Sequence, residues 1–359
     1  MGDKMTEGYN DDPYEKDEIE EKEFNIHYDL SSYGIDFDVS GLVRRLQNES
    51  IYLPDFQRNY VWSKKKASRF IESLLLGLPI PSICLYKEDN NKQLIIDGFQ
   101  RLETIKRFYE GKFGKSVFSL SAVRDDLKKK RYKDLDEEYR RKLDDTLIHA
   151  TIVKAEDPTE KNYDAIYLIF ERLNTGGVNL SPQEIRVCIH HGPFQKIIEQ
   201  LSKNVNFIKI LDIDNKRKKD QEVVLRLLAL AESFTKYSGN MKQYLNEYMF
   251  YNKNTTIGSF KNQIELFNKV FGIFEKALTL DVFKPSKVVN LAITDAIFCG
   301  TYHRLKKGNI TDINLYKTLV NSILEDNLFI DSIKTGKTHH TDSIHKRIQI
   351  SIDKLGTCK

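Results

Sequence analysis

The chain has 359 residues, of which 40% are hydrophobic and 30% charged, and its formal net charge is +4. This composition is typical of a soluble, folded protein with two domains or one large domain plus a helical extension. No apolar run approaches the roughly 20 residues that span a bilayer, and residues 1–23 lack the features of a signal peptide, so we expect a cytoplasmic protein.

The chain begins with a strongly acidic segment. Residues 1–23 hold ten acidic residues against three lysines, a balance of −7, so the remaining chain carries +11. We predict an acidic disordered tail over 1–30, which can compete with nucleic acid for a basic face. Basic clusters recur in the rest of the chain, at 44–45, 64–66, 128–131 and 216–219. They suit a polyanion such as DNA, or they are ordinary solvated surface; both interpretations remain open.

Strands and helices alternate through the next hundred residues. The predicted strands are 51–53, 83–86, 93–96 and 149–153. The predicted helices are 39–47, opened by Ser40, and 65–76, ended by Gly77 and Pro79. The second and third strands flank a polar run and read as a hairpin.

The last strand of that hairpin runs into a glycine turn and directly into a helix. Asp97 ends the strand, Gly98 permits close approach of the backbone, and Gln100 and Arg101 supply donors from the first helical turn; Gly111 ends the helix. The start of a helix leaves backbone N–H groups unpaired and attracts phosphate. Asp97 can orient a water or hold a divalent cation. The same pattern also occurs as plain architecture.

A second group of polar residues lies where a later helix ends. That helix ends at the pair 176–177, and the next begins at a capping box with Ser181 as N-cap, Pro182 at its first position and Glu184. Helix capping explains these residues without a ligand. It does not explain the polar residues bunched just before them, which are Glu171, Arg172, Asn174 and Thr175.

From 190 onward the apolar spacing is helical throughout. We therefore predict an α+β protein with a mixed domain at 31–190 and an all-helical domain at 191–359. A late histidine group at 339–345 reads as a polar loop leading into the last helix. The cysteines lack metal-ligand and disulfide spacing and are expected to be buried free thiols, namely Cys84, Cys188, Cys299 and Cys358.

Three ordered motifs give the chain a specific resemblance. Residues 54–62, 96–101 and 170–186 resemble the motifs of the GmrSD-type N-terminal domain family, in order and spacing, and the similarity covers roughly 35–250. The resemblance implies a fold like that of ParB and sulfiredoxin, a small mixed sheet with helices. It also implies a place in bacterial restriction or anti-phage defence.

The family signature Asp-Gly-Gln-Gln-Arg is tied to hydrolysis of a nucleoside triphosphate. The resemblance therefore implies catalytic roles for Asp97, Gln100 and Arg101, with Asp97 also holding Mg²⁺. Phe99 stands where the family usually has glutamine, so one side-chain amide is missing. The nucleotide-binding residues implied by the resemblance are Gln57, Arg58, Gly98, Glu171, Arg172, Asn174 and Thr175.

Two classes of function follow from this resemblance. The first is a Mg²⁺-dependent NTPase, of unidentified base preference, that acts as a sensor or regulator in a DNA-directed defence system. The second is a non-hydrolysing module that binds DNA or a protein, with a nucleotide as a switch or with none. The chain shows no His-Asn-His nuclease motif, so any nuclease is expected to be a separate polypeptide. Tyr60 and Trp62 either stack on a base or pack beside the 65–76 helix.

Overall fold

The computed structural model describes residues 30–53, 60–88, 90–155, 160–173, 180–334 and 336–358. They form two compact units that divide between Asn179 and Leu180. The acidic tail predicted over 1–30 lies outside the described residues, except for Leu30, which begins the first strand. Within the described ranges, no helix has both the length and the apolar character that crossing a membrane requires.

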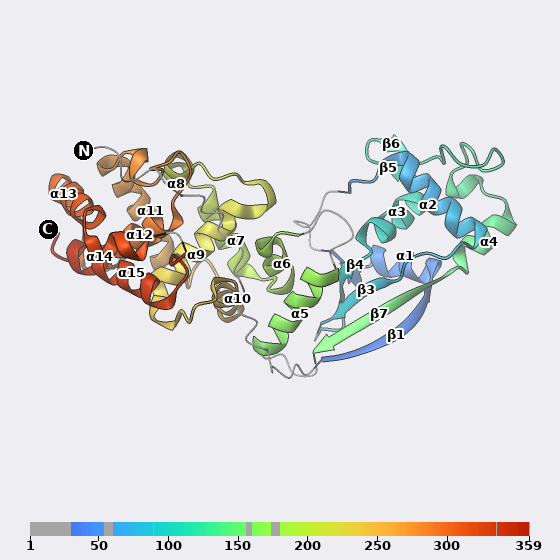
Figure 1. The fold of residues 1–359 in the computed structure, drawn as a ribbon. Helices are drawn as coiled ribbons and strands as arrows, with labels where there is room; N and C mark the ends of the chain where they lie inside the picture. Colours follow the sequence, from blue (N-terminus) through green and yellow to red (C-terminus); the bar gives the residue numbers. More distant parts are fainter. Residues whose placement is uncertain are drawn as a thin grey trace. The chain divides into compact units, whose positions relative to one another are not determined.

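The first unit is built on a five-stranded mixed sheet (Figure 1). Its strand order is β1 (Leu30–Asp38), β7 (Leu147–Ala155), β3 (Ile83–Lys87), β4 (Gln93–Asp97) and β2 (Ile51–Tyr52). The pairs β1–β7 and β3–β4 are antiparallel, whereas β7–β3 and β4–β2 are parallel. A separate two-stranded hairpin consists of β5 (Lys112–Phe113) and β6 (Ser116–Val117). The predicted strands are confirmed, and β1 and the small hairpin are additional.

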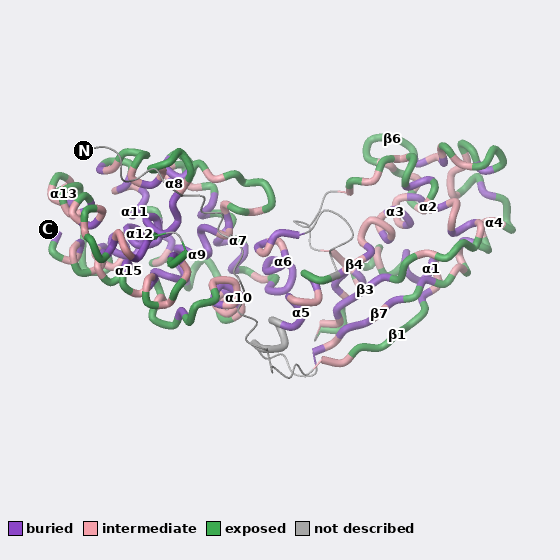
Figure 2. The backbone as a smooth tube through the Cα atoms, viewed as in Figure 1, coloured by how far each residue is buried: buried purple, intermediate pink, exposed green. Residues whose placement is uncertain are grey.

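Helices cover both faces of this sheet. One face packs with the helices α1 (Val39–Gln47), α2 (Lys64–Leu76), α3 (Phe99–Glu110) and α4 (Glu137–Asp144) around a shared apolar core. Ile95 of β4 belongs to this core. Its neighbours Leu94 and Ile96 are also buried and point to the other face because side chains alternate along a strand. There α5 (Glu160–Leu173) packs against β4. Figure 2 shows the inner strands β3 and β7 as largely buried.

The helix boundaries follow local capping chemistry, with one correction. The N-cap of α1 is Asp38, whose carboxylate accepts a hydrogen bond from the backbone nitrogen of Gly41 at 2.6 Å. The prediction that Ser40 opens this helix is wrong. Ser40 lies inside the first turn, and its hydroxyl donates a hydrogen bond to Asp38. The stop at Gly77, in the left-handed conformation, is confirmed.

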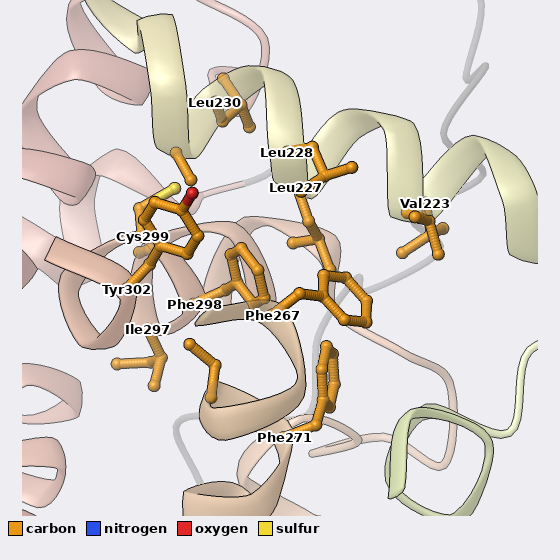
Figure 3. Close-up of a cluster of buried hydrophobic side chains, with 14 of the residues drawn as sticks. Val223, Leu227, Leu228, Leu230, Phe267, Phe271, Ile297, Phe298, Cys299 and Tyr302 are labelled. Atoms are coloured by element: carbon orange, nitrogen blue, oxygen red, sulfur yellow. The ribbon is translucent and has the colours of Figure 1, made fainter. Parts of the chain in front are cut away.

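The second unit is helical. Its helices are α6 (Pro182–Ile189), α7 (Pro193–Ser202), α8 (Val205–Leu211), α9 (Lys219–Ser233), α10 (Met241–Asn252), α11 (Lys261–Ala277), α12 (Leu291–Lys307), α13 (Ile313–Leu324), α14 (Asn327–Ser332) and α15 (Thr341–Leu355). Leu227 of α9, Phe267 of α11 and Phe298 of α12 meet in its core (Figure 3). His340 is the N-cap residue of α15, so His339 and His340 precede the last helix as predicted, whereas His345 lies within it. All four cysteines are buried and free.

Buried ion pairs tie the helices of this unit together. Arg226 of α9 donates to both carboxylate oxygens of Asp295 of α12, with the closest contact at 2.7 Å. Arg347 of α15 lies 3.5 Å from the same carboxylate. Arg186 of α6 pairs with Glu222 of α9 at 2.9 Å. This pairing explains why α6 lies with the helical unit, whereas the boundary expected from the sequence, at 190/191, follows α6.

Candidate functional site

The first polar group forms around the junction of β4 and α3. Gly98 has φ = 99°, a left-handed conformation that favours glycine. A Cβ atom at this position would lie 2.5 Å from Cγ2 of Ile83, so the turn has no room for a side chain. No side chain caps the start of α3. The first-turn N–H groups therefore lie at a tight, glycine-defined junction suited to an anion.

Asp97 and Arg101 lie together across this turn. An Nη2 atom of Arg101 lies 2.7 Å from Oδ2 of Asp97 and also donates to the carbonyl oxygen of Ser82 at 2.9 Å. The Arg101 side chain is 16% exposed and that of Asp97 is 39% exposed. Within the described residues, Nε of Arg101 is buried and has no hydrogen-bond partner. The guanidinium thus neutralises Asp97. Its Nε–H group has no hydrogen-bond acceptor among the residues that the structure describes.

Gln100 has a role that the sequence did not reveal. Its side-chain oxygen accepts hydrogen bonds from the backbone nitrogens of Val61 at 3.1 Å and Trp62 at 3.4 Å. One turn later on α3, Thr104 lies 2.7 Å from the hydroxyl of Tyr60. Gln100 therefore anchors the segment 60–62 to α3. No local pattern predicts this contact, because it joins residues nearly forty positions apart.

The two aromatic side chains of this segment pack against the protein. The Tyr60 ring meets Phe113 edge to face at 5.7 Å. The Trp62 ring meets Phe70 of α2 in the same way at 5.6 Å. Both rings are half-buried; Trp62 packs beside α2 as predicted, whereas Tyr60 packs against β5 and α3.

The remaining predicted binding residues are only partly described. Gln57, Arg58, Asn174 and Thr175 lie outside the described residues. Glu171 and Arg172 are exposed near the carboxyl end of α5. Since α5 begins shortly after β7 and returns across the sheet against β4, it runs in the direction of β4 (Figure 1). Its carboxyl end therefore points toward the edge of the sheet where β4 ends at Asp97.

Cys84 pairs with Asp97 in the register of β3 and β4. Burial, and then the negative charge of Asp97, raise the pKa of the Cys84 thiol to about 11. A raised pKa favours the protonated thiol at neutral pH. The charged and polar groups of the junction are Asp97, Arg101 and backbone N–H groups.

Metal binding at this site rests on a single carboxylate. Among the residues that the structure describes, no group of three or more His, Cys, Asp or Glu side chains is placed to hold a metal ion. Mg²⁺ is commonly held by one or two carboxylates together with phosphate oxygens and water. Asp97 fits that arrangement only when a phosphate ligand completes it.

A lysine-rich surface lies beside the same segment. Lys64 at the start of α2 donates to the carbonyl oxygen of Val117 at 3.0 Å, which joins α2 to the hairpin β5–β6. Lys65 and Lys66 follow on α2 and are exposed, and the first turn of α2 holds no acidic residue. The hairpin adds two exposed lysines, Lys112 and Lys115. We call these five residues the lysine surface.

Comparison with known proteins gives a family match. Residues 39–191 match the family model described as the GmrSD restriction endonuclease, N-terminal domain. The match contains the β4–α3 junction, the segment 60–62, the lysine surface and the end of α5; it leaves out β1. No curated protein matches the chain.

Proposed function

Because residues 39–191 form a GmrSD-type N-terminal domain, we propose that this protein is a nucleotide-dependent sensor or regulator in a DNA-directed restriction or anti-phage system. It binds a nucleoside triphosphate with Mg²⁺ at the junction of Asp97, Gly98 and Arg101, and hydrolyses it. It works in the cytoplasm with a nuclease on a separate polypeptide. The observation that supports this most is the Asp97–Arg101 pair at an uncapped helix start.

The residues of the junction fit a phosphate group. Arg101 offers the buried Nε donor, and the start of α3 offers backbone N–H groups. Gly98 keeps the surface of the turn free of a side chain. Bound Mg²⁺ would supply charge neutralisation at the phosphate oxygens. Asp97 would bind that ion or orient a water, and its pairing with Arg101 would hold its carboxylate in place.

Residues from two other motifs are proposed to complete the pocket. Gln57 and Arg58 lie in the motif between β2 and Tyr60. The carboxyl end of β2 lies beside β4, because the two strands are parallel, and Gln100 anchors the chain again at Val61. One flank thus pairs with the start of β4, where Tyr52 lies opposite Leu94, and the other is held to the first turn of α3. Glu171 and Arg172 approach from α5, and Asn174 and Thr175 follow them in the sequence.

DNA is the proposed macromolecular partner, and the lysine surface is its proposed contact. Three lysines at the amino end of a helix oppose the helix dipole and cost stability unless an anion compensates them. The polyanionic backbone of DNA is such an anion. Gln100 connects this surface to the nucleotide junction through the backbone of Val61 and Trp62.

Two observations favour a second candidate function, a module that binds nucleotide without hydrolysing it. Phe99 replaces an amide side chain at the start of α3, and Asp97 is already paired with Arg101. A phosphate-release assay with the four NTPs, Mg²⁺, and either duplex DNA or none separates the candidates. Hydrolysis of any NTP supports the enzyme. Binding without phosphate release supports the switch, and neither binding nor release by folded protein contradicts both.

A further inference from the structure

Strand β1 leaves a long, open edge on the sheet. It is the terminal strand of the order β1-β7-β3-β4-β2, and nine of its residues pair with β7 without a bulge. Among the described residues, no strand pairs with its outer edge. Residues 32–36 are all exposed, and Figure 2 shows β1 as an exposed strand beside the buried β7.

An edge of this kind usually carries a device that blocks pairing with another strand. Common devices are proline, charged side chains (lysine above all) and β-bulges. Strand β1 has no proline, lysine or bulge: its sequence is LSSYGIDFD, its register with β7 is continuous, and its only charged residues are Asp36 and Asp38. It instead exposes two large apolar side chains on one face, Tyr33 at 45% and Ile35 at 40%. The edge is therefore suited to pairing.

We propose that the partner of this edge is β1 of a second copy, paired antiparallel about a twofold axis at Gly34. In that register Tyr33 of one copy lies opposite Ile35 of the other, twice by symmetry, which is a favourable aromatic and β-branched pair. Asp36 lies opposite Ser32, and Asp38 lies opposite Leu30. No carboxylate faces a carboxylate. All nine residues of the strand take part.

One competing symmetric register is less favourable. A twofold axis at Asp36 places two carboxylates directly opposite each other, which is destabilising. Gly34 also fits the axis for a structural reason. A Cβ atom at Gly34 would lie 2.7 Å from Cε1 of His149, so the imidazole lies over the glycine, and Nδ1 of the same ring pairs with Asp36 at 2.8 Å. A side chain at position 34 would therefore collide with this imidazole.

Sedimentation velocity of the full chain over a range of concentrations tests the proposal. We expect a monomer–dimer equilibrium. Ile35→Lys should weaken the dimer by about tenfold or more, because it removes both symmetric pairs and places charge on the edge. Leu147→Lys is the matched control, since Leu147 is 62% exposed on the neighbouring strand β7 and should leave the equilibrium unchanged. A monomer at every concentration contradicts the proposal.

Cysteine cross-linking tests the register. Tyr33→Cys and Ile35→Cys proteins are prepared separately, oxidised alone, and oxidised as a mixture. The native cysteines are buried, so the background should be low. Only the mixture should give a covalent dimer in high yield, because residue 33 faces residue 35 of the partner. Equal yields in the separate proteins, or no product in the mixture, overturn the register about Gly34. Circular dichroism confirms that each variant is folded.

Discussion

The side-chain oxygen of Gln100 lies 3.1 Å from the backbone nitrogen of Val61 and accepts its hydrogen bond. A residue of the predicted signature therefore binds the protein itself, and its catalytic role stays a prediction. Through this contact and that with Trp62, the first turn of α3 holds the backbone just before α2.

The first prediction uses Trp62, the only tryptophan of the chain, as a reporter. Gln100→Ala removes the acceptor for the Val61 and Trp62 backbone N–H groups, so the segment should loosen. We expect stronger acrylamide quenching of Trp62 fluorescence and a loss of about 1 kcal/mol in stability. Gln93→Ala, on the same β4–α3 unit, is the control. Unchanged quenching in Gln100→Ala would show that the segment is held by other contacts.

Arg101→Ala should weaken nucleotide binding by more than about tenfold, because one charged phosphate contact contributes roughly 1.5–3 kcal/mol. Calorimetric titration with Mg²⁺ and each NTP measures the effect. Arg131→Ala is a matched control, since Arg131 forms a similar short-range ion pair with Asp134 elsewhere in the same unit. Equal affinities in the two variants would remove Arg101 from the site.

Gly98→Ala should destabilise the first unit by about 2 kcal/mol or more, from backbone strain and from overlap with Ile83. Gly114→Ala provides the comparison. Gly114 also has a positive φ, of 59°, but a Cβ there meets nothing within 4 Å. It should cost only the strain, about 1 kcal/mol. Urea unfolding compares the two, and equal losses would mean that Ile83 moves aside freely.

The two arginines that pair with the buried Asp295 should contribute unequally to the stability of the helical unit. Arg226→Met removes the main partner of Asp295 and should cost about 3–5 kcal/mol. Arg347→Met should be milder, because Arg226 still pairs with that carboxylate. Thermal and urea unfolding, followed by helical circular dichroism, measure both. If Arg347→Met proves the more damaging change, then Arg347 is the dominant partner of Asp295.

His190 predicts a dependence of stability on pH. Burial, with lesser contributions from the charges of Lys253 and Arg186, lowers the pKa of His190 to about 3. Unfolding restores the ordinary pKa near 6.5. Between about pH 6.5 and 3, His190 therefore binds a proton in the unfolded chain but not in the folded one. Stability should therefore fall as pH drops from about 6.5 toward 3, by up to about 1.4 kcal/mol per pH unit.

The measurement is urea unfolding at pH 7 and pH 5. Wild type should lose about 2 kcal/mol more than His190→Phe over that interval, since phenylalanine keeps the ring beside Phe250 but cannot bind a proton. The exposed neighbour His191, changed to Phe, is the control. Parallel losses in wild type and His190→Phe would contradict a depressed pKa for His190.

Local sequence signals were sufficient for most of the fold. Glycine stops, apolar spacing and the capping box at Ser181 placed the helices, because these features act within a few residues. Strand β1 was not predicted, although Tyr33, Ile35 and Phe37 alternate with Gly34, Asp36 and Asp38, and five of its nine residues are exposed. Its existence depends on pairing with β7, a partner far away in the sequence.

The contacts of the candidate site also divide into local ones, which the sequence predicted, and tertiary ones, which it did not. The turn at Gly98 is a local feature, and the sequence predicted both this turn and the helix that follows it. The ion pair of Asp97 with Arg101 joins residues one helical turn apart and follows from that local geometry. The contacts of Gln100 with Val61 and of Lys64 with Val117 do not, because tertiary packing alone brings those segments together. The roles of Gln57, Arg58, Asn174 and Thr175 stay predictions.

The pairing of β1 with β7 has a consequence for synthesis of the chain. Ile35 pairs with Ala150, so well over one hundred residues must leave the ribosome after β1 before its partner strand exists. At roughly 5–20 residues per second, the nascent strand waits for on the order of ten seconds. An unpaired strand with exposed apolar residues is prone to aggregation during such a delay. The residues at 1–23 that precede β1 carry a balance of −7, and like charge opposes association between chains.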